Sequence, residues 1–198
     1  MKKIISGIME LNLPNKLTLL RIALVPVYLV LLACGWNFTA LVVFAVASLT
    51  DLLDGKIARK YNLVSNFGKF MDPIADKLLT HTAFIMLCAM DRLNVIACII
   101  FIAREFVVSG LRLVAVEQGL VIAAGMSGKI KTVLQMILAL LLTVLPAVPA
   151  LPLISLIPMI VPVLTVAAEL LMLAAAAMTL YSMVEYVWQN RAVLGGAK

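Results

Sequence analysis

The sequence contains few charged residues. Aspartate, glutamate, lysine and arginine make up 13% of its 198 residues, whereas 64% are hydrophobic and the mean hydropathy is +1.13. Soluble domains contain about 25% charged residues, and a water-exposed fold of this size could not bury so much apolar area. The composition therefore excludes a soluble globular protein and predicts a single all-α membrane domain over residues 1–198.

Cysteine and histidine are also scarce. The three cysteines, Cys34, Cys88 and Cys98, form no CxxC pair and no cluster with His81, the only histidine. This pattern argues against a zinc or disulfide site. We interpret the cysteines as small packing residues and His81 as a packing or hydrogen-bonded residue inside a helix.

Six apolar stretches are long enough to cross a membrane, since a spanning helix needs about 20 mostly apolar residues. They cover residues 17–34, 38–59, 72–90, 94–117, 129–145 and 156–186. Residues 1–13 do not resemble a cleaved signal peptide, because Glu10, Asn12 and Pro14 interrupt any apolar run, and we interpret them as a juxtamembrane cytoplasmic segment. Of the 16 lysines and arginines, all but Arg92 fall on one side of this topology. The positive-inside rule then places both termini in the cytoplasm.

Four aspartates lie at the facing ends of the second and third predicted spans. Asp51 and Asp54 are spaced i,i+3, and Asp72 and Asp76 are spaced i,i+4, so each pair shares a helix face. The connection over residues 60–71 is short enough to make the two helices antiparallel neighbours. Ionised carboxylates near lipid are costly without a cation, and hard oxygen ligands favour Mg²⁺, Mn²⁺ or Ca²⁺. The spacing therefore predicts two divalent cations that grip a diphosphate. The alternative is a set of helix-end acids neutralised by nearby lysines and arginines.

The segment from Asp51 to Asp76 reads Asp-x₂-Asp-Gly-x₂-Ala-Arg-x₈-Gly-x₃-Asp-x₃-Asp. It resembles the signature of the CDP-alcohol phosphatidyltransferase family without a departure. The resemblance implies six transmembrane helices, usually in a homodimer, and two Mg²⁺ or Mn²⁺ ions. It also implies an active site on the cytoplasmic face of the inner (cytoplasmic) membrane. The implied donor substrate is CDP-diacylglycerol, and the implied acceptor is a small polyol phosphate.

The resemblance also implies roles for individual residues. The metal ligands would be Asp51, Asp54, Asp72 and Asp76, and Asp76 would also be the general base. The residues implied to contact the CDP-lipid are Gly55, Arg59 and Gly68, with Ser65 in the loop and Asn15, Lys16 and Thr18 at the start of the first span. For Asn15 a helix cap is the alternative.

Basic residues in the second half of the chain suggest a site for the acceptor's phosphate. Arg104, Glu105 and Arg112 form one polar stripe on the fourth predicted span, and Lys129 and Lys131 open the fifth. Arginine and lysine bind phosphate oxygens well. Two alternatives stay open: Arg104 could pair with a nearby glutamate, and the lysines could simply extend to the membrane surface.

Four segments together are most similar to the bacterial family members that use sn-glycerol 3-phosphate. They are residues 12–21, 71–79, 104–112 and 128–135. The resemblance implies phosphatidylglycerophosphate and CMP as products. An inositol phosphate acceptor, a membrane prenyltransferase and a cation transporter remain as alternatives, although a transporter would place its acids near mid-membrane. The net charge of +6 needs no nucleic acid partner, since anionic lipid headgroups attract a cationic face.

Overall fold

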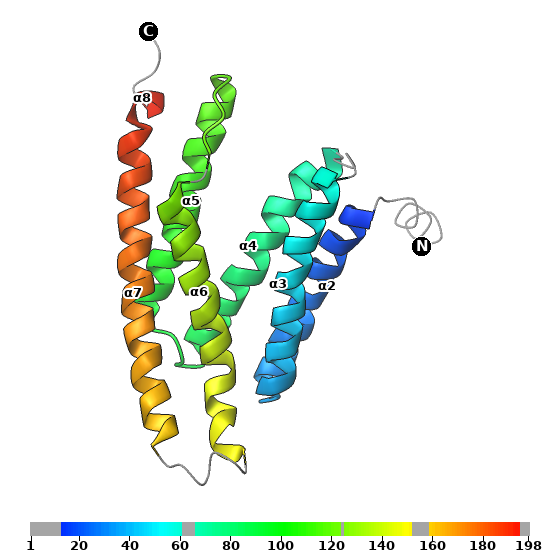
Figure 1. Ribbon diagram of the computed structural model, residues 1–198, viewed down its shortest axis with the longest axis vertical. Coiled ribbons are helices and arrows are strands. Elements are labelled where there is room, and N and C mark those ends of the chain that lie inside the picture. Colours follow the sequence, from blue (N-terminus) through cyan, green and yellow to red (C-terminus); the bar gives the residue numbers. More distant parts are fainter. Residues whose placement is uncertain (1–12, 61–65, 124, 152–158, 195–198) are drawn as a thin grey trace. The chain divides into compact units, whose positions relative to one another are not determined.

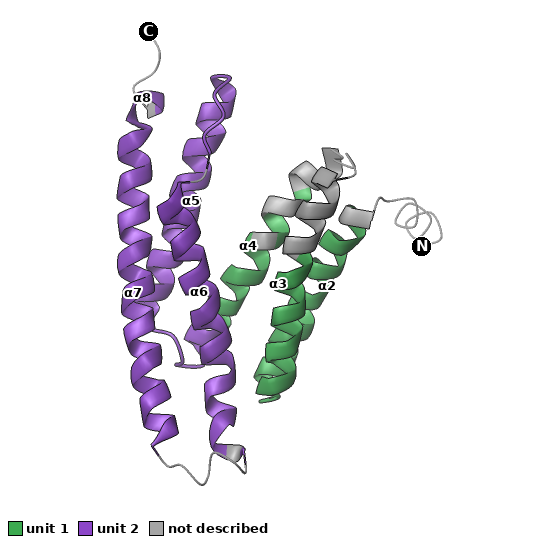
Figure 2. Cartoon of the chain, in the orientation of Figure 1, with its two compact units in different colours: residues 1–86 green, residues 87–198 purple. Residues whose placement is uncertain are grey.

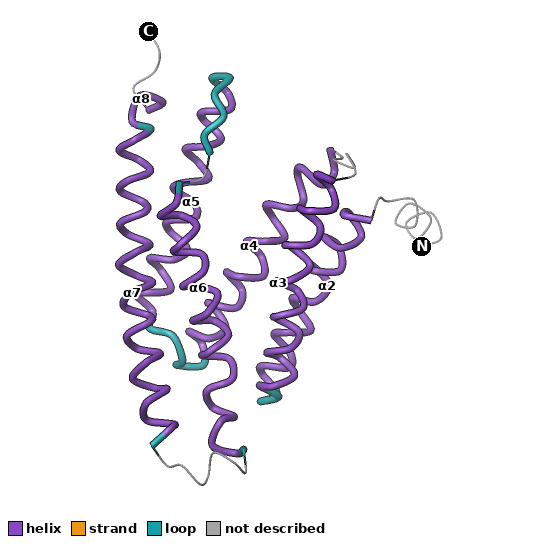
Figure 3. Tube along the Cα trace, in the orientation of Figure 1, coloured by secondary structure: helices purple, strands orange, loops and turns teal. Residues whose placement is uncertain are grey.

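The structure is a computed structural model that describes residues 13–60, 66–123, 125–151 and 159–194. Within these ranges, the description leaves out the side chains of residues 13, 14, 51–60, 66–70, 72, 73, 76, 150 and 194. Every regular element in the described ranges is a helix (Figure 3). The elements are α2 (Leu13–Ala33), α3 (Asn37–Lys60), α4 (Asn66–Ala89), α5 (Val95–Glu117), α6 (Met126–Val144), the 3₁₀ helix η1 (Leu145–Ala150), α7 (Ile160–Gln189) and α8 (Arg191–Leu194). The all-helical prediction is confirmed for this part of the chain.

The chain divides into two compact units, unit 1 (Met1–Met86) and unit 2 (Leu87–Lys198), as Figure 2 shows. The prediction of a single domain over residues 1–198 stays a prediction. The juxtamembrane segment predicted for residues 1–13 lies, apart from Leu13, outside the described residues.

Unit 1 is built on the contact between α2 and α3, which run in opposite directions side by side (Figure 1). Their connection, residues 34–36, contains Gly35, whose φ of +77° is a left-handed conformation that glycine adopts without strain. Gly35 N–H donates to the Leu32 carbonyl and Trp36 N–H to the Leu31 carbonyl, so α2 ends in a Schellman motif. The rings of Tyr28 and Phe44 then meet at 5.3 Å between centroids, and both side chains are fully buried. This aromatic pair joins the two helices in their apolar halves.

The start of α4 differs from the sequence-based expectation. The third span was expected to begin at Asp72, after a connection over residues 60–71, but α4 begins at Asn66. Gly68 is therefore helical and does not lie in a loop. A single glycine weakens a helix by only about 1 kcal/mol relative to alanine, so the helix can continue through it.

Unit 2 is organised around α7, which packs against both α5 and α6. The buried residues of α7 are Ala168, Ala175, Thr179, Ser182 and Tyr186. Their spacings of three, four and seven residues place them on one face. Small residues on such a face, such as Ala175, let neighbouring backbones approach closely.

At the α8 end of unit 2, an apolar cluster joins α5, α7 and α8. Its buried members are Val108, Leu111, Ala115, Tyr186 and Val193. The turn after α5 contains Gly119 with a φ of +73°, and Leu120 N–H donates to the Ala115 carbonyl at 2.8 Å. Gln118 Nε2 adds a 3.0 Å hydrogen bond to the Val193 carbonyl. These contacts connect the end of α5 to α8.

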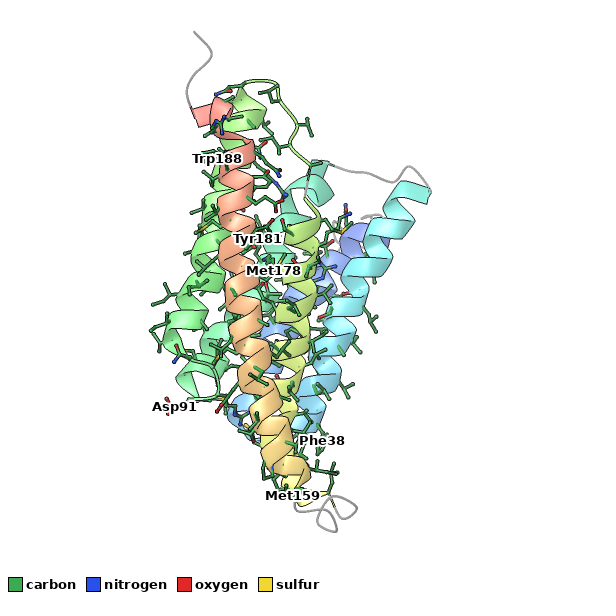
Figure 4. The ribbon with its side chains drawn as sticks, turned by 60° about the vertical axis from the view of Figure 1, so that its left-hand side comes forward. Phe38, Asp91, Met159, Met178, Tyr181 and Trp188 are labelled. Carbon is green, nitrogen blue, oxygen red and sulfur yellow. The ribbon has the colours of Figure 1, made fainter. Side chains whose placement is uncertain are left out.

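Three of the described helices are long and apolar enough to cross a membrane, namely Asn15–Ala33, Met126–Pro149 and Ile160–Gln189. The apolar parts of α3 and α4 are shorter, at Asn37–Thr50 and Lys77–Ala89. Six spans were predicted, and that number stays a prediction. The helix α5 differs from the three helices named above because the charged residues Arg104, Glu105 and Arg112 interrupt its apolar sequence. Along α7, apolar side chains including Leu170, Leu173 and Val184 are exposed in this chain, as expected for contact with lipid. Trp188 lies near the end of α7 (Figure 4), and the Arg191 guanidinium lies 4.7 Å from the Trp188 ring centroid.

Candidate functional site

The aspartates predicted to bind metal lie on the helical backbones of α3 and α4. Asp51 and Asp54 fall in the last turns of α3, and Asp72 and Asp76 fall in the first half of α4. Because both segments are α-helical, each pair lies one turn apart on its helix, as predicted. The side chains of these four residues are outside the description, so their contacts stay a prediction.

The two acid pairs also lie at matching distances from the ends of their helices. Asp54 lies six residues before Lys60, and Asp72 lies six residues after Asn66, so each is about 9 Å from its helix end at about 1.5 Å per residue. By the same rise, Asp51 and Asp76 lie about 14 and 15 Å from those ends. The helices run in opposite directions (Figure 1), and Lys60 and Asn66 are at most about 21 Å apart along an extended chain. The backbone therefore permits the acids to face each other at two levels. A set of four carboxylates fits Mg²⁺ or Mn²⁺ by its donor chemistry.

The residues predicted to contact the CDP-lipid are distributed over three elements of unit 1. Gly55 and Arg59 lie in the last turns of α3, and Gly68 lies in the first turn of α4. The side chain of Arg59 is not described, and Ser65 lies outside the described residues. Their binding roles remain predictions.

The start of α2 carries a polar face that the sequence analysis identified only in part. Asn15, Thr18 and Arg21 are all buried at i,i+3 spacing, whereas Lys16 is exposed. Asn15 lies within the first turn of α2, which begins at Leu13, and not at the cap position. Arg21 was not predicted as a site residue, although its spacing from Thr18 could have identified it. Arginine at this depth is costly unless it has a polar role.

In unit 2, α5, α6 and α7 together form one buried polar network. We define this polar network as Arg104, Glu105, Lys131, Gln135, Thr179 and Ser182. At its centre, Glu105 Oε1 accepts a 2.8 Å hydrogen bond from Arg104 Nη1 and a second hydrogen bond from Lys131 Nζ. Arg104 and Lys131 are both buried. Two of the predicted phosphate-binding residues are thus brought together by one carboxylate.

The other members of the polar network lie on α6 and α7, and they form hydrogen bonds that hold Arg104 and Lys131 in place. Lys131 Nζ donates to Gln135 Oε1 at 3.1 Å, and Gln135 Nε2 donates to Thr179 Oγ1 at 3.0 Å. Arg104 Nε donates to Ser182 Oγ at 3.3 Å. Hydrogen bonds between helices in an apolar environment fix the side chains that make them.

One edge of the Arg104 guanidinium has no hydrogen-bond partner among the described residues. Its Nε and Nη1 atoms bond to Ser182 and Glu105, whereas Nη2 lies beside Gly128 at the start of α6. A Cβ atom built on Gly128 would lie 3.0 Å from Nη2. The polar network contains two cationic side chains and one carboxylate, so an anion at Nη2 would balance its charge.

The other two predicted phosphate-binding residues lie apart from the polar network. Arg112 Nε donates to the Tyr186 hydroxyl at 3.0 Å, and its guanidinium lies 5.5 Å from that ring's centroid. Lys129 is exposed. The predicted pairing of Arg104 with a nearby glutamate does occur, at Glu105, but the same carboxylate also orients Lys131.

A cavity of about 720 Å³ lies near the end of α6 and the first half of α7. It is lined by polar and charged side chains that include Asp91, Arg92, Thr165 and Glu169, and by no residue of the polar network. Two acids and one arginine favour a phosphate much less than the polar network does. The polar network is therefore the better candidate for the predicted phosphate site, and its binding role stays a prediction.

Sequence reasoning missed several members of the polar network. Glu105 was treated as a possible partner of Arg104 only, and Gln135, Thr179 and Ser182 were not singled out. The i,i+4 spacing of Lys131 and Gln135 was a usable signal. The polar residues Thr179 and Ser182 in a long apolar helix were another, because such residues usually bond across helices.

Comparison with known proteins gives a consistent result. The sequence profile of the CDP-alcohol phosphatidyltransferase family matches residues 11–181. A Bacillus subtilis protein named CDP-diacylglycerol–glycerol-3-phosphate 3-phosphatidyltransferase is 46% identical over 141 residues, covering 64% of this chain and 73% of that protein. A Rickettsia typhi protein of the same name is 45% identical over 128 residues, covering 63% and 72%. A Mycobacterium tuberculosis protein named probable phosphatidylglycerophosphate synthase is 37% identical over 193 residues, covering 94% and 85%. This chain belongs to the CDP-alcohol phosphatidyltransferase family.

Proposed function

We propose that this protein transfers the phosphatidyl group of CDP-diacylglycerol to sn-glycerol 3-phosphate, forming phosphatidylglycerophosphate and CMP. The observation that supports an acceptor with its own phosphate is the buried pair Arg104 and Lys131, joined by Glu105. An acceptor with its own phosphate needs such cations, whereas an uncharged alcohol does not. The names of the relatives support the same reaction, which belongs to phospholipid biosynthesis.

The proposed reaction forms one bond and breaks one bond at phosphorus. The acceptor hydroxyl oxygen attacks the β-phosphorus, which carries diacylglycerol, and its proton passes to Asp76. The bond from that phosphorus to the CMP oxygen breaks, and CMP leaves with the electron pair. A general base must lie within hydrogen-bond reach of the proton that it takes. In this proposal Arg59, with Gly55, Gly68 and Ser65, binds the CDP part of the donor together with Asn15, Lys16 and Thr18.

Two Mg²⁺ or Mn²⁺ ions held by Asp51, Asp54, Asp72 and Asp76 would supply charge stabilisation at the diphosphate. The residues of the chain do the positioning. Arg104 and Lys131 bind the acceptor's phosphate, with Arg112 and Lys129 attracting the anion from the membrane surface. Holding both reactants in place supplies much of the rate enhancement in reactions of this kind.

The proposed setting is the inner (cytoplasmic) membrane. The chain crosses it six times as a homodimer, with both termini and the active site on the cytoplasmic side. The positive-inside rule supports this orientation, because Arg92 alone among 16 basic residues falls in a predicted outer loop.

One assay tests the proposed reaction. Purified protein in lipid nanodiscs receives CDP-diacylglycerol, Mg²⁺ or Mn²⁺, and labelled glycerol 3-phosphate, inositol phosphate or serine in parallel. We expect labelled lipid and CMP with glycerol 3-phosphate alone. CMP release with another acceptor would reject the acceptor and keep the family reaction, and no CMP with any acceptor would reject the proposal. Arg104→Gln should abolish lipid formation, whereas the matched Arg191→Gln, at an exposed arginine, should retain it.

A further inference from the structure

Glu105 is the one acid of the polar network, and it contacts both cations. We propose that Glu105 is a positioning residue that aims Arg104 and Lys131 at the acceptor's phosphate, and that Gly128 keeps the binding edge of Arg104 open. The inference rests on the proposed function, since it assigns these residues to the acceptor site of that reaction. Neither residue contacts the acceptor in this proposal; Glu105 acts through Arg104 and Lys131, and Gly128 acts through Arg104.

The orientation of the Arg104 guanidinium follows from two contacts on different edges. Ser182 accepts from Nε at 3.3 Å, and Glu105 accepts from Nη1 at 2.8 Å. Because the guanidinium group is planar and rigid, two such contacts fix both its position and its plane. The donors of Nη2 are then held in one direction, beside Gly128. A phosphate oxygen there meets donors that need no rearrangement, which lowers the entropy lost on binding.

The same carboxylate oxygen fixes the second cation. Lys131 Nζ bonds to Glu105 Oε1 and to Gln135 Oε1, and Gln135 is in turn held by Thr179. The flexible lysine side chain is thereby held near the guanidinium. Without the carboxylate, two like charges would repel each other in a medium of low dielectric constant and move apart.

Gly128 contributes through its size. An alanine Cβ at this position would lie 3.0 Å from Arg104 Nη2. This distance is shorter than the usual van der Waals contact between a methyl carbon and a nitrogen atom. Elsewhere the end of an arginine would move aside, but here Ser182 and Glu105 hold it. A methyl group at Gly128 would therefore displace the guanidinium or cover the edge that binds phosphate.

A rival interpretation makes the opposite prediction. If Glu105 merely occupied the cations until phosphate displaced it, removing its charge would free them and tighten the binding of glycerol 3-phosphate. A positioning role predicts weaker binding, so the sign of the change in KM separates the two.

The experiment measures steady-state kinetics in nanodiscs for the wild-type protein, Glu105→Gln, Glu105→Asp and Gly128→Ala. For Glu105→Gln we expect the KM for glycerol 3-phosphate to rise about tenfold, the effect of losing one charge-assisted hydrogen bond. The KM for CDP-diacylglycerol should stay within about twofold, a free-energy change of roughly 0.4 kcal/mol. Glu105→Asp keeps the charge, and its KM for glycerol 3-phosphate should lie between those of the wild-type protein and Glu105→Gln. Gly128→Ala should also raise the KM for glycerol 3-phosphate.

Glu117→Gln is the matched control, because it makes the same chemical change at an exposed position of the same helix. It should leave both KM values unchanged. A lower KM in Glu105→Gln would overturn the inference, as would a fall in kcat alone with both KM values unchanged. If Glu105→Gln does not fold, Glu105→Asp and Gly128→Ala decide: a raised KM for glycerol 3-phosphate supports the inference, and an unchanged one rejects it. Absence of product from the wild-type protein would instead reject the proposed function itself.

Discussion

The hydrogen bond between Gln135 and Thr179 allows a direct test of the contact between α6 and α7. Thr179 is fully buried, and its hydroxyl accepts from Gln135 Nε2 at 3.0 Å while donating to the Ala175 carbonyl. Valine has nearly the same shape as threonine, so Thr179→Val opens no cavity. It removes one hydrogen bond between helices, worth up to about 1.7 kcal/mol in membranes. It also leaves a buried amide donor unsatisfied, which costs about 1–3 kcal/mol. We expect Thr179→Val to lower the free energy of unfolding by about 1–2 kcal/mol.

The matched control is Thr165→Val on the same helix. The Thr165 hydroxyl makes the same type of bond, to the Val161 carbonyl at 3.0 Å, but the residue is exposed. This variant should change the free energy of unfolding by less than about 0.5 kcal/mol. Both can be measured by unfolding in mixed detergent micelles, followed by circular dichroism. Values for the two variants that agree within about 0.3 kcal/mol would refute the reasoning. Gln135→Leu combined with Thr179→Val should cost less than the sum of the single changes.

Four further predictions concern two glycines of unit 2, the proposed general base and the predicted metal ions. Gly119→Ala should destabilise the protein by about 1 kcal/mol, because an L-residue is strained at a φ of +73°; the helical Gly110→Ala, with nothing within 4 Å of its new Cβ, should instead stabilise it by about 0.5–1 kcal/mol in the same unfolding assay. Asp76→Asn should abolish turnover while calorimetry still detects CDP-diacylglycerol binding, and wild-type turnover would remove Asp76 from the role of base. EDTA should abolish activity and added Mg²⁺ or Mn²⁺ should restore it; full activity in EDTA would count against the predicted ions.

Sequence patterns predicted most of the helices because apolar length is a strong signal. Residues 38–59 and 94–117 were predicted as spans, and α3 and α5 match them to within one residue at each end. The start of α4 was wrong because residues 60–71 were interpreted as a polar connection. A helix can extend beyond its apolar span into a polar segment, so α4 begins six residues earlier, at Asn66. The aspartate spacing needed no tertiary information, because it depends on helical geometry alone.

The polar network, the candidate acceptor site, was predicted only in part. Arg104 and Lys131 were both predicted to bind phosphate, but the sequence did not distinguish the buried Lys131 from the exposed Lys129. Their connection through Glu105 could not be predicted, because α5 and α6 come together through tertiary packing and not through sequence spacing. Arg112 shows the same limit: it shares a stripe with Glu105 on α5, yet its partner is Tyr186 on α7. Which side chains meet across helices depends on how α7 packs against both neighbours.

The positions of Trp188 and Arg191 near the end of α7 indicate how far the polar network would lie below the membrane surface. Aromatic rings with adjacent cations mark the boundary between headgroups and hydrocarbon. With Trp188 as that boundary and α7 upright, Ser182 lies about 9 Å and Thr179 about 14 Å below it. In the proposed reaction, the phosphate of a water-soluble acceptor would therefore shed most of its hydration shell before it reached Arg104. The ordered pair of cations would replace those lost water contacts, so the lipid product would form at the level of its own acyl chains.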